Sequence, residues 1–278
     1  MFSILLSVAI DLTCIRDTAA TSDGLVTDWL VCGPFPSGEM TVFYEDQLKE
    51  LGGEQAVAPT EGMTVTTKSP YKGIDNWYEK VMWQKHHTKE DGYVDFAALY
   101  LSKPSQGSQK IAYAFCTIES PEKRRVLLEV RTDDALQVWV NHREVIYNHL
   151  FRGGWRQGGV DLIVVDLEKG SNLLLVKVGD YRYTGWGFAM RVVEAHEKIY
   201  VHQKDILLPH LRVGERLAGW ASISLVNTTP DRLDRVTVEV KENDLFSHKM
   251  TSAQPLELEW DSRVAFWLET KRKVTLSD

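Results

Sequence analysis

Short runs of β-branched and aromatic residues, separated by turn residues, dominate the chain from Val126 onward. This pattern is typical of antiparallel β structure, because such side chains pack well on a pleated, half-buried surface. Tight turns are expected at 141–143 and 168–171, where Asn141 and Gly170 supply the positive φ angles that hairpins need. The pattern predicts strands at residues 126–131, 136–140, 144–147, 160–166, 173–178 and 187–193.

The pattern upstream of these strands is less regular. Apolar runs at 30–35 and 111–118 predict two more strands, and 43–51 is expected to form one or two helical turns. The segment 52–108 is polar and poorly periodic. It includes Trp77, Tyr78 and Trp83, and rings of that size should hold the segment against the body. Trp139 is expected in the core rather than exposed on a sheet face.

A second strand pattern begins near Ile206, where apolar and polar residues alternate at 220–226, 236–240, 256–260 and 264–268. It predicts a small immunoglobulin-like β-sandwich, which when complete has about seven strands. Only four or five can be counted here, so the sandwich is expected to be truncated. The predicted fold class is all-β with two domains, 25–200 and 201–278, preceded by a leader over 1–24.

The first ten residues form a short apolar stretch, and Thr18 and Ala20 are spaced like the small residues of a signal-peptide cleavage site. No Lys or Arg precedes this stretch, so the leader is interpreted either as a signal peptide or as a disordered segment. A signal peptide predicts a secreted or periplasmic protein. No other stretch approaches the ~20 apolar residues of a membrane span.

Composition and charge narrow the choice of partner. With 44% hydrophobic and 26% charged residues among 278, the chain is globular and long enough to bury two cores. A formal net charge of −7 without a dense Lys/Arg run excludes the electrostatic footprint of a nucleic-acid binder. Cys14, Cys32 and Cys116 lack metal or redox spacing, so buried free thiols are expected, with a Cys32–Cys116 bridge left open.

Two segments resemble galactose-binding-like jelly-roll domains. Residues 28–36, DWLVCGPFP, look like the opening strand of such accessory domains, with Cys32 where an aliphatic residue is usual. Residues 132–141, TDDALQVWVN, and 167–178, LEKGSNLLLVKV, resemble the sugar-binding domain of family 2 glycoside hydrolases, with His142 where Gly commonly follows Asn. The resemblance implies a bacterial accessory domain over 25–194. It also allows a structural calcium ion, although no dense run of carboxylates predicts one.

The alternating direction of consecutive antiparallel strands predicts that three polar connections lie together. If the six strands from Val126 onward run antiparallel in sequence, the connections after Arg131, Tyr147 and Val178 emerge at one end and the tight turns at the other. Aromatic rings stack on the apolar face of a pyranose, and polar side chains exchange hydrogen bonds with its hydroxyls. The predicted ligand-binding residues are Trp155, Arg152, Arg156, Tyr181, Tyr183, Trp186 and Asp134.

Several of these candidates also have a purely structural explanation. Asp134, next to Asp133, is typical of a turn fixed by side-chain hydrogen bonds. Trp186, between two glycines, is equally explained as a packed plug where a strand restarts. Trp155 lies in the sequence GGWRQGG, where it serves either as a stacking ring or as an anchor of the loop.

Catalytic motifs are missing from the sequence. No G-x-S-x-G nucleophile elbow occurs, and His196, Glu197 and His202 miss the spacing of a zinc protease. With 39 acidic residues, a glycosidase carboxylate pair cannot be chosen from sequence. We therefore expect no enzyme activity, no catalytic residue, no cofactor and no metal ligand.

The predicted function is a non-catalytic carbohydrate-binding module of a secreted protein, with a glycan as partner. The alternative is the N-terminal bracing part of a secreted α/β-hydrolase, an esterase or peptidase, whose catalytic domain is the partner. The resemblance supports both functions, because many domains on this scaffold are only structural.

Overall fold

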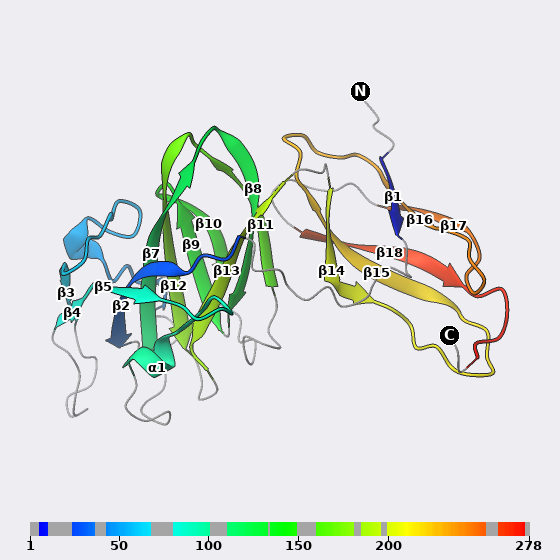
Figure 1. Ribbon diagram of the computed structural model, residues 1–278, viewed down its shortest axis with the longest axis horizontal. Helices are drawn as coiled ribbons and strands as arrows, with labels where there is room; N and C mark the ends of the chain where they lie inside the picture. Colours follow the sequence, from blue (N-terminus) through cyan, green and yellow to red (C-terminus); the bar gives the residue numbers. More distant parts are fainter. Residues whose placement is uncertain are drawn as a thin grey trace. The chain divides into compact units, whose positions relative to one another are not determined.

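The computed structural model describes residues 6–10, 24–36, 43–67, 80–100, 110–132, 134–148, 160–180, 185–195, 199–253 and 261–275, and these residues are mostly β-strand (Figure 1). The chain forms two compact units, Ser22–Glu194 and Ala195–Asp278, the latter together with Met1–Thr21. The elements in chain order are β1 (Leu6–Ile10), β2 (Asp28–Pro36), η3 (Lys49–Leu51), β3 (Thr64–Thr66), β4 (Lys80–Met82), β5 (Gln84–His87), β6 (Tyr93–Asp95), α1 (Phe96–Tyr100), β7 (Lys110–Ser120), β8 (Arg124–Thr132), β9 (Ala135–Val140), β10 (Arg143–Asn148), β11 (Val160–Leu167), β12 (Gly170–Asp180), β13 (Gly187–Glu194), β14 (Ile199–Leu207), β15 (Ala218–Asn227), β16 (Val236–Val240), β17 (Lys249–Ala253) and β18 (Asp261–Glu269).

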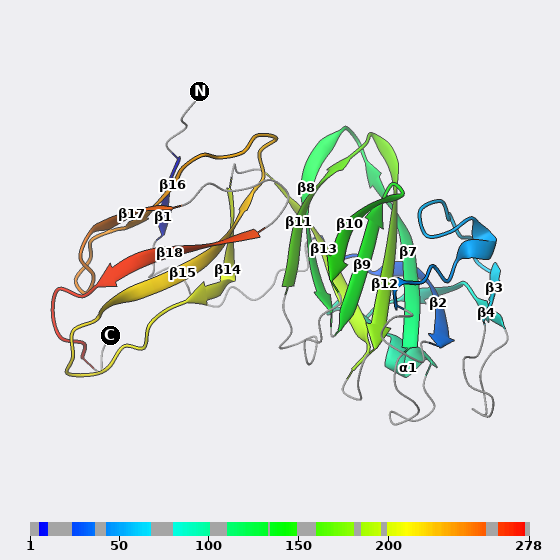
Figure 2. The ribbon, with the colours of Figure 1, turned by 180° about the vertical axis from the view of Figure 1, so that it is seen from behind.

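Two antiparallel sheets form the sandwich of the unit Ser22–Glu194, and β3 and β4 pair separately. One has the strand order β10-β9-β12-β7-β2-β5, and the other has the order β11-β8-β13-β6 (Figure 2). The chain passes between the sheets repeatedly, from β7 to β8, back to β9, and again from β12 to β13. This is a jelly-roll β-sandwich, so the predicted fold class is confirmed, and all six strands predicted from Val126 onward are present.

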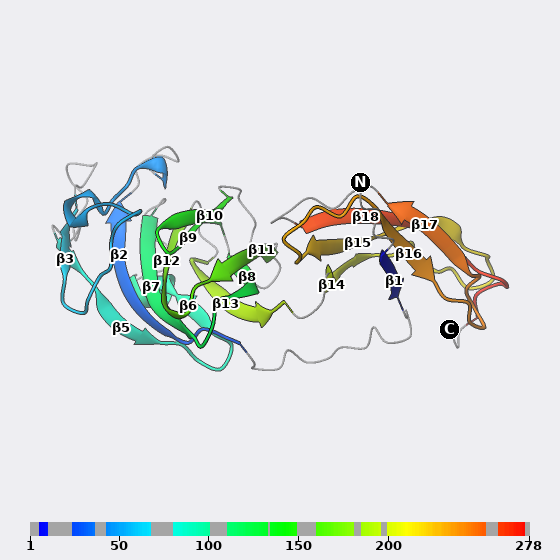
Figure 3. The ribbon, with the colours of Figure 1, turned by 90° about the horizontal axis from the view of Figure 1, so that it is seen from above.

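The main core of this unit lies between the two sheets, as the view from above shows (Figure 3). Alternate residues of the six-stranded sheet, such as Leu136, Val138 and Val140 of β9, belong to this core together with Val126, Leu128 and Val130 of β8. Because side chains of a strand alternate between its faces, the period-two pattern of the sequence becomes one buried inner face on each sheet.

A second apolar cluster covers the outer face of the six-stranded sheet. Trp139 of β9 is 2% exposed and Trp83 is fully buried, and both belong to this cluster with residues of the segment 43–67. The core placement predicted for Trp139 is thus confirmed, although it lies in the outer cluster. Of the predicted aromatic anchors of 52–108, Trp83 does hold the segment against the body, whereas Trp77 and Tyr78 lie outside the described residues.

The hairpin between β9 and β10 turns on two residues with positive φ angles, 49° at Asn141 and 68° at His142. These are the left-handed angles of a two-residue hairpin turn, which Asn tolerates well. His142 in place of the usual Gly therefore leaves the turn intact, as the sequence predicted.

Cys32 and Cys116 are buried free thiols. Cys32 belongs to the outer cluster and Cys116 to the main core, so their side chains lie on opposite faces of the sheet. The free-thiol prediction is confirmed for these two residues, and the Cys32–Cys116 bridge is not formed. Burial raises the pKa of the Cys116 thiol to about 12.

The second unit is a smaller sandwich of two sheets, with strand orders β14-β15-β18 and β1-β16-β17. Its core contains Ile223, Leu225, Val238 and Phe266. The predicted small β-sandwich is confirmed, and the predicted strands at 220–226, 236–240 and 264–268 are present. The one predicted at 256–260 lies outside the described residues.

Two strands of this unit, β14 and β17, were not predicted. A third addition comes from the expected leader, because Leu6–Ile10 forms β1 and pairs in parallel with β16, Leu6 opposite Val236. A disordered leader over 1–24 therefore does not describe these five residues.

Candidate functional site

The strand ends that flank the three polar connections lie together at one end of the jelly roll, which we call the rim. Val160, the first residue of β11, pairs with Arg131 near the end of β8, and Phe188 of β13 pairs with Thr132. In the other sheet, Ala135 of β9 pairs with Gly179 of β12. Only Asp133 and Asp134 separate β8 from β9, so these ends of the two sheets meet at the same rim.

A side-chain hydrogen bond crosses the rim at the second connection. The Nδ2 of Asn148, the last residue of β10, donates to Oδ1 of Asp161 in β11 over 3.1 Å. The two sheets are thus joined by this hydrogen bond between the end of β10 and the start of β11. The arrangement that strand parity predicted is present in the strand ends.

Five of the seven predicted ligand-binding residues are not among the residues that the structure describes. These five lie outside the described residues and stay predictions: Arg152, Trp155, Arg156, Tyr181 and Tyr183.

The structure corrects the prediction that Trp186 binds a ligand. Its side chain is 1% exposed, its ring centroid lies 5.4 Å from that of Phe96 and 5.9 Å from that of Tyr100, and its Nε1 donates to the carbonyl oxygen of Val178 over 3.3 Å. A ring enclosed in this way offers no face to a ligand in solution. Trp186 is the packed plug of the structural explanation.

The structure also corrects the prediction that Asp134 binds a ligand. It is 2% exposed and lies directly before β9, so its carboxylate is enclosed beneath the rim. Lys110 and Asp180, paired across β7 and β12, are enclosed there as well, with Nζ and Oδ2 3.9 Å apart and side chains 5% and 8% exposed. Burial lowers the pKa of Lys110. These groups support the rim from below rather than meeting a ligand on it.

An exposed pair of tyrosines beside the rim was missed by the sequence reasoning. Tyr44 is 54% exposed and Tyr147 is 37% exposed, and their ring centroids lie 5.9 Å apart with the planes tilted by 42°. Tyr147 directly precedes Asn148, the rim residue of β10. No local signal links two residues so far apart in the sequence, because the contact depends on how 43–67 folds over the sheet.

Hydrogen-bonding groups lie next to this tyrosine pair. Gln137 is the cross-strand partner of Tyr147, and its Nε2 donates to Oε2 of Glu144 over 2.5 Å. Glu144 is exposed, whereas Gln137 is 8% exposed. The face therefore combines two accessible rings with the exposed carboxylate of Glu144, and these groups can bind the apolar face and the hydroxyls of a sugar.

A buried charged network holds the segment that carries Tyr44. The Nζ of Lys177, whose side chain is fully buried, donates to Oε1 of Glu54 over 2.7 Å and to the carbonyl oxygen of Glu45 over 2.9 Å. The hydroxyl of Tyr113 donates to the same Glu54 oxygen over 2.5 Å, and the Lys177 ammonium lies 5.0 Å from the ring centroid of Phe43. Burial raises the pKa of Glu54 and lowers the pKa of Lys177, and the contact between the two charges opposes both shifts.

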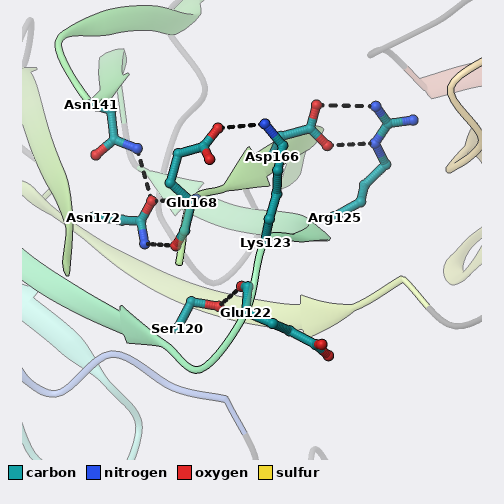
Figure 4. Close-up of polar contacts among 8 residues, drawn as sticks. All are labelled: Ser120, Glu122, Lys123, Arg125, Asn141, Asp166, Glu168 and Asn172. Carbon is teal, nitrogen blue, oxygen red and sulfur yellow. Dashed lines mark hydrogen bonds and ion pairs between the residues drawn. The ribbon is translucent and has the colours of Figure 1, made fainter. Parts of the chain in front are cut away.

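The opposite end of the jelly roll is closed by its own hydrogen bonds (Figure 4). Asn172 is 1% exposed; its Nδ2 donates to the Glu168 carbonyl oxygen over 2.8 Å, and its Oδ1 accepts from Nδ2 of Asn141 over 2.8 Å. Arg125 donates to both carboxylate oxygens of Asp166, over 2.8 and 3.1 Å. Since these groups satisfy one another, the tight-turn end is a structural cap and the rim is the better candidate for a ligand.

Neither a metal site nor a membrane span is indicated by the part of the chain that the structure describes. No three or more His, Cys, Asp or Glu side chains come together there in a way that could hold a metal ion, so no calcium site is assigned. None of the described helices has the length and apolar character needed to cross a membrane.

The two packed sheets and their strand order define a galactose-binding-like β-sandwich, followed in the chain by a smaller β-sandwich. No protein-family model matches the chain, and no curated protein matches it. Solved structures do match. A family 35 carbohydrate-binding module from Clostridium thermocellum aligns with 34% of this chain and 83% of its own, at 15% identity and a TM-score of 0.25.

Two glycosidases also align with the chain. A family 2 β-galacturonidase from Eisenbergiella tayi covers 71% of this chain, at 21% identity and a TM-score of 0.40. A family 2 glycosyl hydrolase from Bacteroides cellulosilyticus covers 90% of it, at 13% identity and a TM-score of 0.39. The aligned parts make up 34% and 31% of these two enzymes, so the chain corresponds to about a third of their length.

Proposed function

We propose that the chain is a non-catalytic carbohydrate-binding accessory module of a secreted bacterial protein, and that it binds glycan at the rim and the adjoining Tyr44–Tyr147 face. The observation that carries the proposal is the gathering of the strand ends at one rim beside two exposed tyrosine rings. Stacking on these rings and hydrogen bonds to the exposed carboxylate of Glu144 provide both halves of sugar recognition.

The Lys110–Asp180 ion pair beneath the rim gives no preference for a highly charged glycan over a neutral one. Lys110 and Asp180 pair with each other, so neither offers an uncompensated charge to a ligand. Trp155, Tyr181 and Tyr183 would extend the aromatic surface, since their connections leave from the same rim.

The proposal is tested by affinity electrophoresis of the full chain through gels that contain soluble neutral polysaccharides, namely xyloglucan, galactomannan and laminarin. Tyr147→Ala and Trp155→Ala should each weaken retardation by one of these polymers without lowering the melting temperature. Trp186→Ala is the contrasting variant, since removal of a buried tryptophan should cost about 3 to 5 kcal/mol of stability.

Two results would contradict this function. If none of the polymers retards the wild-type chain, the glycan proposal fails. If Tyr147→Ala and Trp155→Ala instead lower the melting temperature and leave retardation unchanged, both rings are structural anchors and the rim is not the site.

A specific observation favours a second function, bracing of a hydrolase domain. The connection between β14 and β15 carries three large exposed apolar side chains, Leu208 at 49%, Leu211 at 43% and Val213 at 58%. Grouped exposed apolar residues are typical of surfaces that meet another protein. Reading the coding sequence beyond Asp278 tests this function, since an in-frame hydrolase domain supports it and a stop codon contradicts it.

A further inference from the structure

The outer face of the sheet β14-β15-β18 carries two tryptophans directly opposite each other. Trp220 of β15 pairs with Trp267 of β18, and their ring centroids lie 5.3 Å apart in an edge-to-face arrangement with an interplanar angle of 83°. Trp220 is 62% exposed, more than any other large hydrophobic side chain that the structure describes. Exposed indole surface costs hydrophobic free energy, so a pair held open on a sheet face indicates a surface that meets a ligand.

The residues next along the two strands are small. Ser222 and Ala265 form the following outward-facing pair, since Ala221, Ile223, Val264 and Phe266 point into the core of this unit. Leu207 of β14, 58% exposed, lies opposite Ser222 on the other side. The tryptophan pair is therefore followed by a stretch where β15 and β18 carry only small outward-facing side chains.

An ion pair borders this stretch at its far end. Arg263 of β18 is the next outward-facing residue, and its guanidinium donates to both carboxylate oxygens of Asp205, over 2.6 and 2.5 Å, and to Oγ of Ser222 over 3.2 Å. At about 3.4 Å per residue in an antiparallel strand, Arg263 and Trp267 lie ~14 Å apart. That separation suits a short oligosaccharide better than a single sugar ring.

We propose that this face, made of Trp220, Trp267, Ser222, Ala265, Arg263 and Asp205, is a second carbohydrate-binding surface, specific for a chain of neutral pyranose residues. The Trp220 indole stacks on the apolar face of one sugar. The Ser222 hydroxyl, the guanidinium and the carboxylate exchange hydrogen bonds with the hydroxyls of the next.

The balance of charge on the face points to a neutral occupant. Arg263 and Asp205 are partly exposed, with side chains at 43% and 32%, and they neutralise each other. An anionic glycan would have to compete with Asp205 for the guanidinium, whereas a neutral sugar can share both partners. This surface belongs to the second unit and does not depend on the rim of the first.

The test combines variants with a direct footprint, using the full chain and the neutral polymers xyloglucan, galactomannan and laminarin, with polygalacturonic acid as the anionic comparison. Trp220→Ala should weaken binding of one neutral polymer about tenfold, which corresponds to ~1.4 kcal/mol, and Trp220→Phe should retain part of it. Met250→Ala is the matched control, because Met250 is 58% exposed on β17 in the other sheet and its removal should change nothing.

The footprint locates the ligand. Oxidation by N-bromosuccinimide, followed by mass spectrometry of the peptides, should show Trp220 and Trp267 protected when the neutral polymer is present. Tyr147→Ala should leave this protection unchanged, so failure of the rim site and failure of this surface are distinguishable.

Three outcomes would overturn the proposal. The first is a wild-type chain in which no neutral polymer protects Trp220. The second is equal binding by wild type and Trp220→Ala when both have the same melting temperature. The third is protection without polymer that rises with protein concentration and accompanies a dimer in sedimentation velocity, because the occupant would then be a second copy of the chain.

Discussion

Removal of the carboxylate of Glu54 should destabilise the first unit strongly. Glu54→Gln leaves the Lys177 ammonium, whose side chain is fully buried, facing a neutral amide at the position of its 2.7 Å partner. Loss of one partner from a buried ion pair costs about 3 to 5 kcal/mol, since the remaining buried charge has lost its direct ion-pair partner. Urea unfolding followed by tryptophan fluorescence measures this cost. The signal reports mainly on the first unit, because its residues include six of the nine tryptophans: Trp29, Trp77, Trp83, Trp139, Trp155 and Trp186.

The chain provides a matched control for this experiment. Lys123 and Glu168 form an ion pair of the same length, 2.7 Å, but their side chains are 67% and 58% exposed. Lys123→Met should have a much smaller effect on stability, because water screens an exposed pair and solvates the remaining charge. If Glu54→Gln and Lys123→Met have equal effects, the buried network does not hold the segment 43–67 in place.

Three further predictions test other parts of the structure. Asn172→Ala should lower the free energy of unfolding by about 2 to 3 kcal/mol, because the backbone carbonyl and amide groups of Glu168 lose their hydrogen-bond partner at the tight-turn end. Thermal unfolding measures this loss, and a value below ~0.5 kcal/mol contradicts the structural role assigned to Asn172. Arg125 holds the pKa of Asp166 below its usual value, so the stability contributed by this ion pair is present above about pH 4 and is lost as the pH falls through the folded-state pKa. Between about pH 5 and about pH 2, the melting temperature should therefore fall less steeply for Asp166→Asn than for wild type. Parallel curves would contradict this. In a Cys14→Ser variant, a thiol reagent should label no cysteine of the folded protein at about pH 8, because this pH is well below the raised pKa of the Cys116 thiol and both Cys32 and Cys116 are buried. Labelling should begin only when the protein is unfolded, and rapid labelling of the folded protein would refute this.

Local sequence signals determined the six strands from β8 to β13, the tight turns and the position of the rim. Alternation at 136–140 and 220–226 marks buried faces because the side-chain period of a strand is two, whatever the strand pairs with. The Asn141–His142 turn follows from the tolerance of those residues for left-handed angles. Strand parity gave the common rim, because consecutive antiparallel strands must alternate direction.

Tertiary structure alone decided which side chains stand at the rim and which lie beneath it. Trp186 and Asp134 have the residue types of a sugar site, yet both are buried, and burial depends on distant residues such as Phe96. The Tyr44–Tyr147 pair, the Lys177–Glu54 contact and the parallel pairing of Leu6–Ile10 with β16 join segments far apart in the chain. Periodicity reports which face of one strand is apolar, but it carries no information about which remote segment covers that face.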